Sequence, residues 1–252
     1  MKMKQIAGTA AITAALAAST ACAARTVPAN AERIPTPAGT VVTITPLMHA
    51  SLRVTLDSIE IQIDPVTELG GRSVSYHAMP KAHFILVTHE HRDHYDEAAI
   101  ATLSRDDTRV VTNARCAAML GRGVAIANGD SLRLNDRISV EAVPAYNTTP
   151  EHLQFHPRGR DNGYILTIDR LRVYVAGDTE DIPEMAQLGH IDIAFLPCNQ
   201  PYTMTVEQLL RAARMVKPRL LIPYHYGDTD LRSVPDALAP DGIAVHLHSQ
   251  LR

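Results

Sequence analysis

Apolar and polar side chains alternate along three short stretches of the first quarter of the chain. A period of two residues is typical of strands with one buried face, and these stretches are 41–45, 51–56 and 59–63. The Asp57-Ser58 pair between the last two predicts the turn of a hairpin. Residues 82–88 form a nearly continuous apolar run, which predicts a strand buried on both faces.

Strand and helix patterns then alternate to the end of the chain. Asp96 is placed to cap a short helix that carries Ile100 and Leu103, and Thr205 with Gln208 has the spacing of a capping box before a longer helix. Further strands are predicted at 109–112, 164–167, 172–176, 191–196, 220–223 and 243–247, and further helices at 114–120 and 234–238. A chain of 252 residues without repeats or internal linkers is most simply one α/β domain.

The first residues have the pattern of a secretory leader. Lys2 and Lys4 precede a short, mildly apolar run and the small residues Ala21-Cys22-Ala23-Ala24. Ala21 and Ala23 fit an A-x-A cleavage site, whereas the residues before Cys22 resemble a lipobox. We therefore expect a signal peptide at 1–24, a linker at 25–39 and the folded domain at 40–252, in a periplasmic or secreted protein with a possible lipid anchor at Cys22.

Composition excludes some function classes. The net charge is −3, and it falls to −5 without the leader, because the leader has two lysines and no acid. No block of Lys or Arg is present, so nucleic-acid binding is not expected and a small-molecule substrate is. Cys116 and Cys198 lack metal-site spacing and are expected to be buried thiols.

Metal ligands are concentrated directly after the buried run at 82–88. His89, His91, Asp93 and His94 have the spacing H-x-H-x-D-H. Imidazole and carboxylate groups suit zinc and similar divalent ions, and four such groups in six positions predict a metal site.

Two later strand ends offer further ligands. Asp178 follows the strand at 172–176 in a Gly-Asp-Thr turn, and His225 follows the strand at 220–223. A carboxylate that bridges two ions and a further histidine are what a dinuclear site needs.

This order of motifs resembles the metallo-β-lactamase superfamily, from about residue 40 to the end. Leu196-Pro197, the run from Tyr202 to Thr205 and the run from Ile222 to Gly227 are similar to the branch of L-ascorbate-6-phosphate lactonase and N-acyl-phosphatidylethanolamine phospholipase D. The resemblance implies a four-layer αββα sandwich with the metal site at one edge of its two sheets.

The resemblance also implies a division of the ligands between two ions. His89 and His91 would bind the first ion, and Asp178 would bridge. Asp93, His94 and His225 would bind the second, while Asp64, at a strand end, would orient a ligand. The expected ion is Zn²⁺, one or two per chain, with Mn²⁺ or Fe²⁺ possible.

The superfamily expects a third histidine on the first ion, where this chain has Asn147. His156, brought back by a folded loop, is the preferred replacement. His152, Asn147 itself, water or a single-ion site stay open. The histidines outside the motif are interpreted as structural: His49, His77, His83, His190, His246 and His248.

The expected chemistry is hydrolysis of a small ester, lactone, amide or phosphodiester by a metal-activated water, with Asp93 as ligand and proton acceptor. Arg158 and Arg160 could hold an anion on the substrate. Oxyanion donors could be Tyr202, Tyr224, Tyr226 or Asn147. A non-catalytic metal-binding protein and an iron-dependent oxidoreductase remain alternatives.

Overall fold

The computed structural model describes residues 27–252. The predicted leader and the Cys22 site lie outside the described residues. Within 27–252, no helix combines the length and apolarity that a bilayer crossing requires.

Two seven-stranded sheets face each other. In sheet order, the first consists of β1 (Glu32–Pro35), β2 (Val41–Met48), β3 (Ser51–Leu56), β4 (Ile59–Ile63), β7 (Phe84–Val87), β8 (Arg109–Thr112) and β9 (Val124–Ala125). The second consists of β10 (Ser131–Arg133), β11 (Ile138–Ala145), β12 (Asp161–Ile168), β13 (Leu171–Val175), β14 (Ile193–Pro197), β15 (Leu220–Tyr224) and β16 (Ala244–Val245). A separate small hairpin pairs β5 (Glu68–Leu69) with β6 (Arg72–Ser73).

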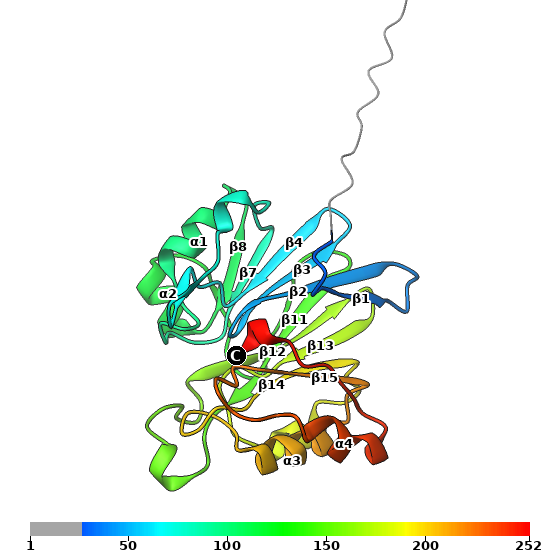
Figure 1. The fold of residues 1–252 in the computed structure, drawn as a ribbon. Helices are drawn as coiled ribbons and strands as arrows, with labels where there is room; N and C mark the ends of the chain where they lie inside the picture. Colours follow the sequence, from blue (N-terminus) through cyan, green and yellow to red (C-terminus); the bar gives the residue numbers. More distant parts are fainter. Residues whose placement is uncertain (1–26) are drawn as a thin grey trace, which may run out of the picture.

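Helices cover the outer side of each sheet (Figure 1). The first sheet is covered by α1 (Glu97–Leu103) and α2 (Ala114–Leu120), and the second by α3 (Val206–Val216) and α4 (Val234–Leu238). Single 3₁₀ turns complete the chain at Tyr76–Ala78, Pro150–His152, Pro183–Gln187, Ala239–Asp241 and Ser249–Leu251. The four layers confirm the predicted αββα sandwich.

Local signals in the sequence explain most of these elements. The Asp96 side chain accepts hydrogen bonds from the first turn of α1, and Thr205 and Gln208 form the predicted capping box of α3. β3 and β4 form the predicted hairpin. Cys116 and Cys198 are buried free thiols, as expected.

Two differences from the sequence interpretation concern the edge strands of the two sheets. The range 25–39, interpreted as a linker, contains β1, whose residues pair antiparallel with β2 through Ile34 and Val42. A strand of four residues with a proline is too short to show periodicity, so only its partner reveals it. The strand predicted at 243–247 is limited to Ala244–Val245.

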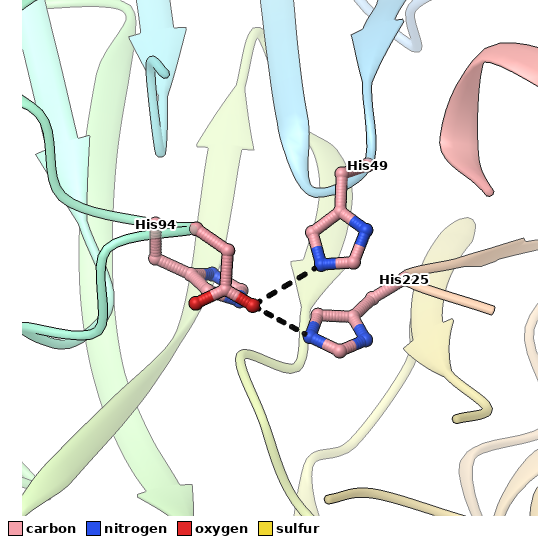
Figure 2. Close-up of side chains that lie close together, drawn as sticks. His49, His94 and His225 are labelled. Atoms are coloured by element: carbon pink, nitrogen blue, oxygen red, sulfur yellow. Dashed lines mark ion pairs between the residues drawn. The ribbon is translucent and has the colours of Figure 1, made fainter. Parts of the chain in front are cut away.

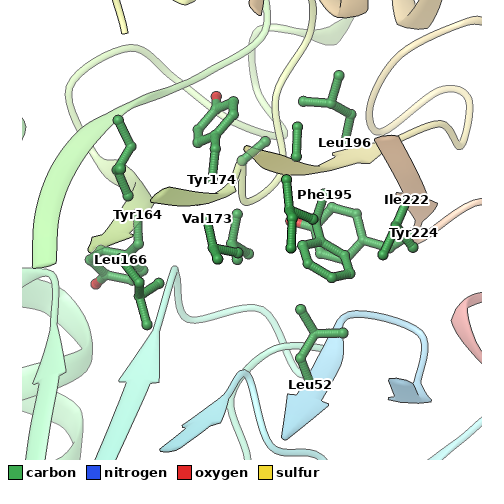
Figure 3. Packing of buried hydrophobic residues seen from close by; sticks show 14 of the residues in the cluster. Leu52, Tyr164, Leu166, Val173, Tyr174, Phe195, Leu196, Ile222 and Tyr224 are labelled. Atoms are coloured by element: carbon green, nitrogen blue, oxygen red, sulfur yellow. The ribbon is translucent and has the colours of Figure 1, made fainter. Parts of the chain in front are cut away.

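The inner faces of the two sheets form the main core. Figure 3 shows Leu52 of the first sheet facing the rings of Phe195 and Tyr224 of the second, and all three side chains are fully buried. With no tryptophan in the chain, branched aliphatic side chains fill most of this layer. Burial of this apolar surface is the main force that holds the sheets together.

Parallel pairing in the middle of each sheet places several strand ends at one edge of the sandwich. β4 pairs parallel with β7, and β13, β14 and β15 are parallel neighbours. The residues that follow these strands therefore meet: Asp64 after β4, His89 after β7, Asp178 after β13 and His225 after β15. Carboxyl ends of parallel strands are the usual place for a site in an α/β sheet.

Candidate metal centre

Four side chains form a first cluster at this edge: His89, His91, His156 and Asp178. One nitrogen or carboxylate oxygen from each lies within 4.8 Å of the others. Asp178 Oδ2 is 3.3 Å from His156 Nε2 and 3.7 Å from His89 Nε2. Three imidazoles and one carboxylate at these separations could surround a single cation.

A second cluster lies beside the first and consists of His49, Asp93, His94 and His225. Asp93 Oδ2 is 3.3 Å from His49 Nε2 and 3.4 Å from His225 Nε2; both ion pairs are drawn in Figure 2. Asp178 reaches this cluster as well, because its Oδ1 is 3.2 Å from His94 Nε2 and its Oδ2 is 3.2 Å from His225 Nε2. Asp178 therefore lies between the two clusters, where a bridging carboxylate would be.

Polar atoms at the centre of both clusters are buried and lack hydrogen bonds. The Nε2 atoms of His49, His89, His94 and His225, together with Asp178 Oδ1, have no hydrogen-bond partner among residues 27–252. A buried polar atom without a partner costs about 1 to 3 kcal/mol. Several such atoms aimed at one space fit a site for cations, which would use their lone pairs.

The opposite ring nitrogens of His94 and His156 are held by neighbouring carboxylates. Asp64 Oδ2 lies 2.8 Å from His94 Nδ1 and also accepts a hydrogen bond from the Thr88 hydroxyl. Asp161 Oδ2 lies 3.0 Å from His156 Nδ1. These contacts fix the ring orientations and leave each Nε2 free for a ligand role, which is the usual support of a metal-binding histidine. Asp64 thus occupies the orienting position that the resemblance implied.

Charge coupling within the clusters shifts several pKa values. Burial alone would lower the pKa of His94, but Asp178 and Asp64 raise it well above its usual range. Burial also lowers the pKa of His225, but Asp178 and Asp93 outweigh it and raise the pKa to about 9. Burial lowers the pKa of His89 and His91, which favours the neutral, ligating form of both rings.

The structure brings His156, and neither Asn147 nor His152, into the first cluster. The loop after β11 folds back so that Asn147 N donates to the carbonyl of His156 at 2.8 Å. Asn147 itself donates its amide to the carbonyls of Tyr202 and His152, and His152 lies beside Glu180. The chain thus supplies a third histidine from nine residues further along the sequence than Asn147, the position at which the resemblance implies it.

His49 is the functional candidate that the sequence interpretation missed. Its place outside the H-x-H-x-D-H motif predicts a structural role, yet it lies in the turn between β2 and β3 with its ring centroid 3.8 Å from that of His225. It has no neighbouring histidine or acid in sequence, so spacing gave no signal. The only hint was its place at the end of an alternating strand.

Three of the site positions have an unusual backbone conformation. His49, Asp64 and His225 all have positive φ, at 57°, 44° and 47°. Residues other than glycine seldom adopt this region, and such strain concentrates at functional sites. At Gly177, with φ of 67°, a Cβ would lie 2.7 Å from the Asn162 carbonyl, so glycine is required for the turn that presents Asp178.

Other predicted participants lie elsewhere. Tyr224 donates its hydroxyl to the Gly177 carbonyl and Tyr226 to the His248 carbonyl, so neither is available as an oxyanion donor. Arg158 is 72% exposed and pairs with Glu184. Arg160 and Tyr202 do line the pocket described next.

A pocket of about 730 Å³ opens onto both clusters. His91, Asp93, His156, Asp178 and His225 form its floor. Its walls come from the β5–β6 hairpin, the loop after β7, α2 and the loops that precede β12 and follow β14. A pocket of this size accepts a small molecule in reach of both clusters.

Comparison with known proteins identifies the family. Residues 59–226 match the model of the beta-lactamase superfamily domain, which is two thirds of the chain. A UPF0173 metal-dependent hydrolase from Pyrococcus furiosus is 32% identical over 203 residues, which cover 73% of this chain and 84% of the relative.

Solved structures show the same fold. A crystal structure from Parabacteroides distasonis, of a protein proposed to be a metal-dependent hydrolase, is 50% identical with a TM-score of 0.84, and the match covers 88% of this chain and 99% of that one. CmlA, a diiron β-hydroxylase from Streptomyces venezuelae, is 15% identical with a TM-score of 0.62 over 81% of this chain and 52% of its own. At that identity the likeness concerns the fold alone.

Proposed function

Since the chain belongs to the beta-lactamase superfamily and is a metal-dependent hydrolase of the metallo-β-lactamase fold, we propose that it acts through a dinuclear centre on a small-molecule substrate. The first cluster would hold one ion and the second cluster the other, with Asp178 shared. The nitrogen-rich donor sets favour Zn²⁺, with Mn²⁺ or Fe²⁺ as the alternatives. The substrate would be an ester, lactone, amide or phosphodiester.

One observation carries this proposal: Asp178 lies within 3.2 to 3.3 Å of rings from both clusters. A buried carboxylate surrounded by four imidazoles would otherwise leave the Nε2 atoms without partners. Two cations on either side of Asp178 satisfy these atoms, and they also balance the carboxylates of Asp93 and Asp178.

The chain's own residues define what the site can do. Bound divalent cations supply Lewis acidity and lower the pKa of a coordinated water to near neutrality. Asp64 and Asp161 hold the rings of His94 and His156 in one orientation. Burial raises the pKa of Asp93, but its close contacts with His225 and His49 outweigh burial and lower the pKa, so the carboxylate is ionised where it lines the pocket floor. We assign to it the exchange of a proton during hydrolysis.

The structure bears differently on the two alternative functions, a non-catalytic metal-binding protein and an iron-dependent oxidoreductase. A non-catalytic protein was considered because the first site lacked a third histidine, and His156 now occupies that place. Iron-dependent redox chemistry is a matter of metal identity, so it becomes an outcome of the test.

The test is metal content and turnover of the purified protein. We expect about two zinc ions per chain, which fall to about one in His49→Ala and in His156→Ala and remain two in His77→Ala, an exposed histidine that belongs to neither cluster. Hydrolysis of generic esters should fall at least about a hundredfold in His91→Ala. A stoichiometry unchanged by His49→Ala, or redox-active iron without hydrolysis, would overturn the proposal.

We further propose that the hydrolase works outside the cytoplasm, on the basis of the leader-like residues 1–24. Mass spectrometry of the protein from fractionated cells tests this. A mature chain that begins near residue 23 to 25 supports a signal peptide, and a lipid adduct on Cys22 supports the anchor. A cytoplasmic chain that retains Lys2 and Lys4 contradicts both.

A further inference from the structure

The pocket above the metal centre has a composition that the hydrolytic reaction alone does not require. Beyond the two clusters, three of its lining residues are arginines: Arg92, Arg115 and Arg160. One acid outside the clusters, Glu90, lines it as well. The wall of the pocket therefore carries more positive than negative charge.

The guanidinium groups of the three arginines are not all engaged in contacts with other side chains of the described residues. Arg92 is exposed, and no hydrogen bond or ion pair within residues 27–252 engages it. Arg115 is 60% exposed, and its contact is with Glu90, at 3.2 Å from Nε to Oε1. Arg160 is bound to Asp161 through Nε and Nη2, while its Nη1 lies 3.6 Å from Glu90. Guanidinium groups with unused donors are the usual ligands of carboxylate and phosphate groups.

Apolar side chains occupy another part of the same wall. The rings of Phe155 and Tyr202 contact each other edge to face, with centroids 5.0 Å apart. Tyr202 is 45% exposed and Met119, on α2, is 49% exposed. Leu69, in the β5–β6 hairpin, completes this surface. Large apolar side chains that stay exposed around a pocket mark a surface that a ligand covers.

We propose that the substrate is an anionic ester or lactone with an apolar body. Its carboxylate or phosphate group would bind Arg92 and Arg115, and its apolar part would lie against Phe155, Tyr202 and Met119. The scissile bond would then lie over Asp178. This inference rests on the proposed hydrolase function and adds the charge and polarity of the substrate to it.

The carboxylate of Glu90, taken alone, would favour a cationic substrate. Its side chain is 7% exposed, and its Oε2 is buried without a hydrogen-bond partner. A cationic substrate could use this oxygen, but it would also face Arg115 and Arg160, which lie 3.2 and 3.6 Å from the other oxygen, Oε1, of the same carboxylate. Like charges at that distance repel, so Glu90 is better suited to a hydroxyl or amide donor, while it aligns the two arginines.

Turnover of a matched pair of esters tests the charge preference. Meta-acetoxybenzoate is anionic, and its methyl ester has the same acetyl group and ring without the charge. After division of each kcat/KM by the rate of that ester with hydroxide, we expect the anionic ester to be preferred at least about tenfold, as for charge-assisted hydrogen bonds. The preference should disappear in an Arg92→Ala, Arg115→Ala double variant and persist in Arg122→Ala, an arginine outside the pocket.

A binding measurement makes the result independent of turnover. Anilinonaphthalene sulfonate and phenylnaphthylamine share one apolar body and differ by a sulfonate, and fluorescence reports the binding of both. We expect tighter binding of the sulfonate, lost in the double arginine variant and increased in Glu90→Gln, which removes the opposing charge. A cation-binding pocket would give the reverse change in Glu90→Gln.

The outcomes separate this inference from the hydrolase proposal. Hydrolysis without an arginine-dependent anion preference overturns the inference and leaves the hydrolase. Arginine-dependent binding of the sulfonate without hydrolysis of either ester overturns the hydrolase and leaves an anion-binding pocket. Equal binding of the two dyes without hydrolysis overturns both.

Discussion

Histidine and carboxylate side chains gather at two distant places in this fold. One is the buried candidate metal centre around Asp178. The other, which we call the edge cluster, consists of Glu32 in β1 with His246 and His248 in the segment after β16. In both places one ligand-type atom from each side chain lies within 4.8 Å of the others. Residue type and proximity alone therefore do not distinguish them.

Hydrogen bonding and burial do distinguish them. In the edge cluster, Glu32 Oε1 lies 2.7 Å from His246 Nδ1 and 2.9 Å from His248 Nε2, so the three groups satisfy one another. His246 is 49% exposed. In the centre, all the rings except the half-buried His91 are buried, and the Nε2 atoms of His49, His89, His94 and His225 lack hydrogen bonds among the described residues. The comparison indicates that buried ligand atoms without hydrogen bonds, rather than a count of histidines, are what mark the group around Asp178 as the candidate metal centre.

The largest expected contrast is between substitution of Asp178 in the candidate metal centre and substitution of Glu32 in the edge cluster. Asp178→Ala removes the group shared by both clusters, so we expect loss of both ions and a decrease in kcat/KM of about a thousandfold or more. Glu32→Ala should change kcat/KM less than about twofold. Metal analysis and ester turnover of the two variants measure this. Equal losses in both variants would contradict the assignment of the centre.

Removal of the metal should have the next largest effect. A ligand present at a hundred times its Kd stabilises the folded state by about 2.7 kcal/mol per site, so chelation should lower the free energy of unfolding by roughly 3 to 5 kcal/mol. Thermal unfolding with and without a chelator measures it. Glu32→Ala should show the same decrease as the unmodified chain, and Asp178→Ala should show almost none.

A smaller effect concerns pH in the protein stripped of metal. The folded pKa of His225 is raised to about 9, above its ordinary 6.5, because Asp178 and Asp93 outweigh the effect of burial. A raised pKa contributes stability below pH 6.5 that is lost as the pH passes 9. We expect a loss on the order of 1 to 3 kcal/mol over this interval. With metal bound the rings carry no proton on Nε2, so denaturant unfolding should show a much flatter profile.

The sequence predicts the layers of the fold well, because alternation, apolar runs and caps are local signals. The hairpin at Asp57-Ser58 and the capping box at Thr205 needed no knowledge of distant residues. The short strand β1 depends on its pairing with β2, and no pattern of its own marks it.

The same distinction applies to the candidate metal centre: local sequence signals mark some of its ligands, and contacts between distant segments bring in the others. The residues from His89 to His94 are a motif of six positions, whereas Asp178 and His225 were identified because they follow strands. His49 comes from a hairpin turn, and its role follows from the contact of that turn with His225 after β15 of the second sheet. His156 depends on the loop that folds back onto Asn147. Neither contact is encoded by spacing.

The smallest predicted effect tests the role of the edge cluster itself. β1 is an edge strand of the first sheet, and the segment after β16 lies at the edge of the second, so Glu32 ties the two sheets together. Its partners are partly exposed, and such contacts contribute about 0.2 to 1 kcal/mol. Glu32→Gln should therefore lower the free energy of unfolding by no more than about 1 kcal/mol, whether or not metal is bound. If chelation changed this difference, the edge cluster would bind a cation too, and burial would not be the feature that separates the two groups of histidines.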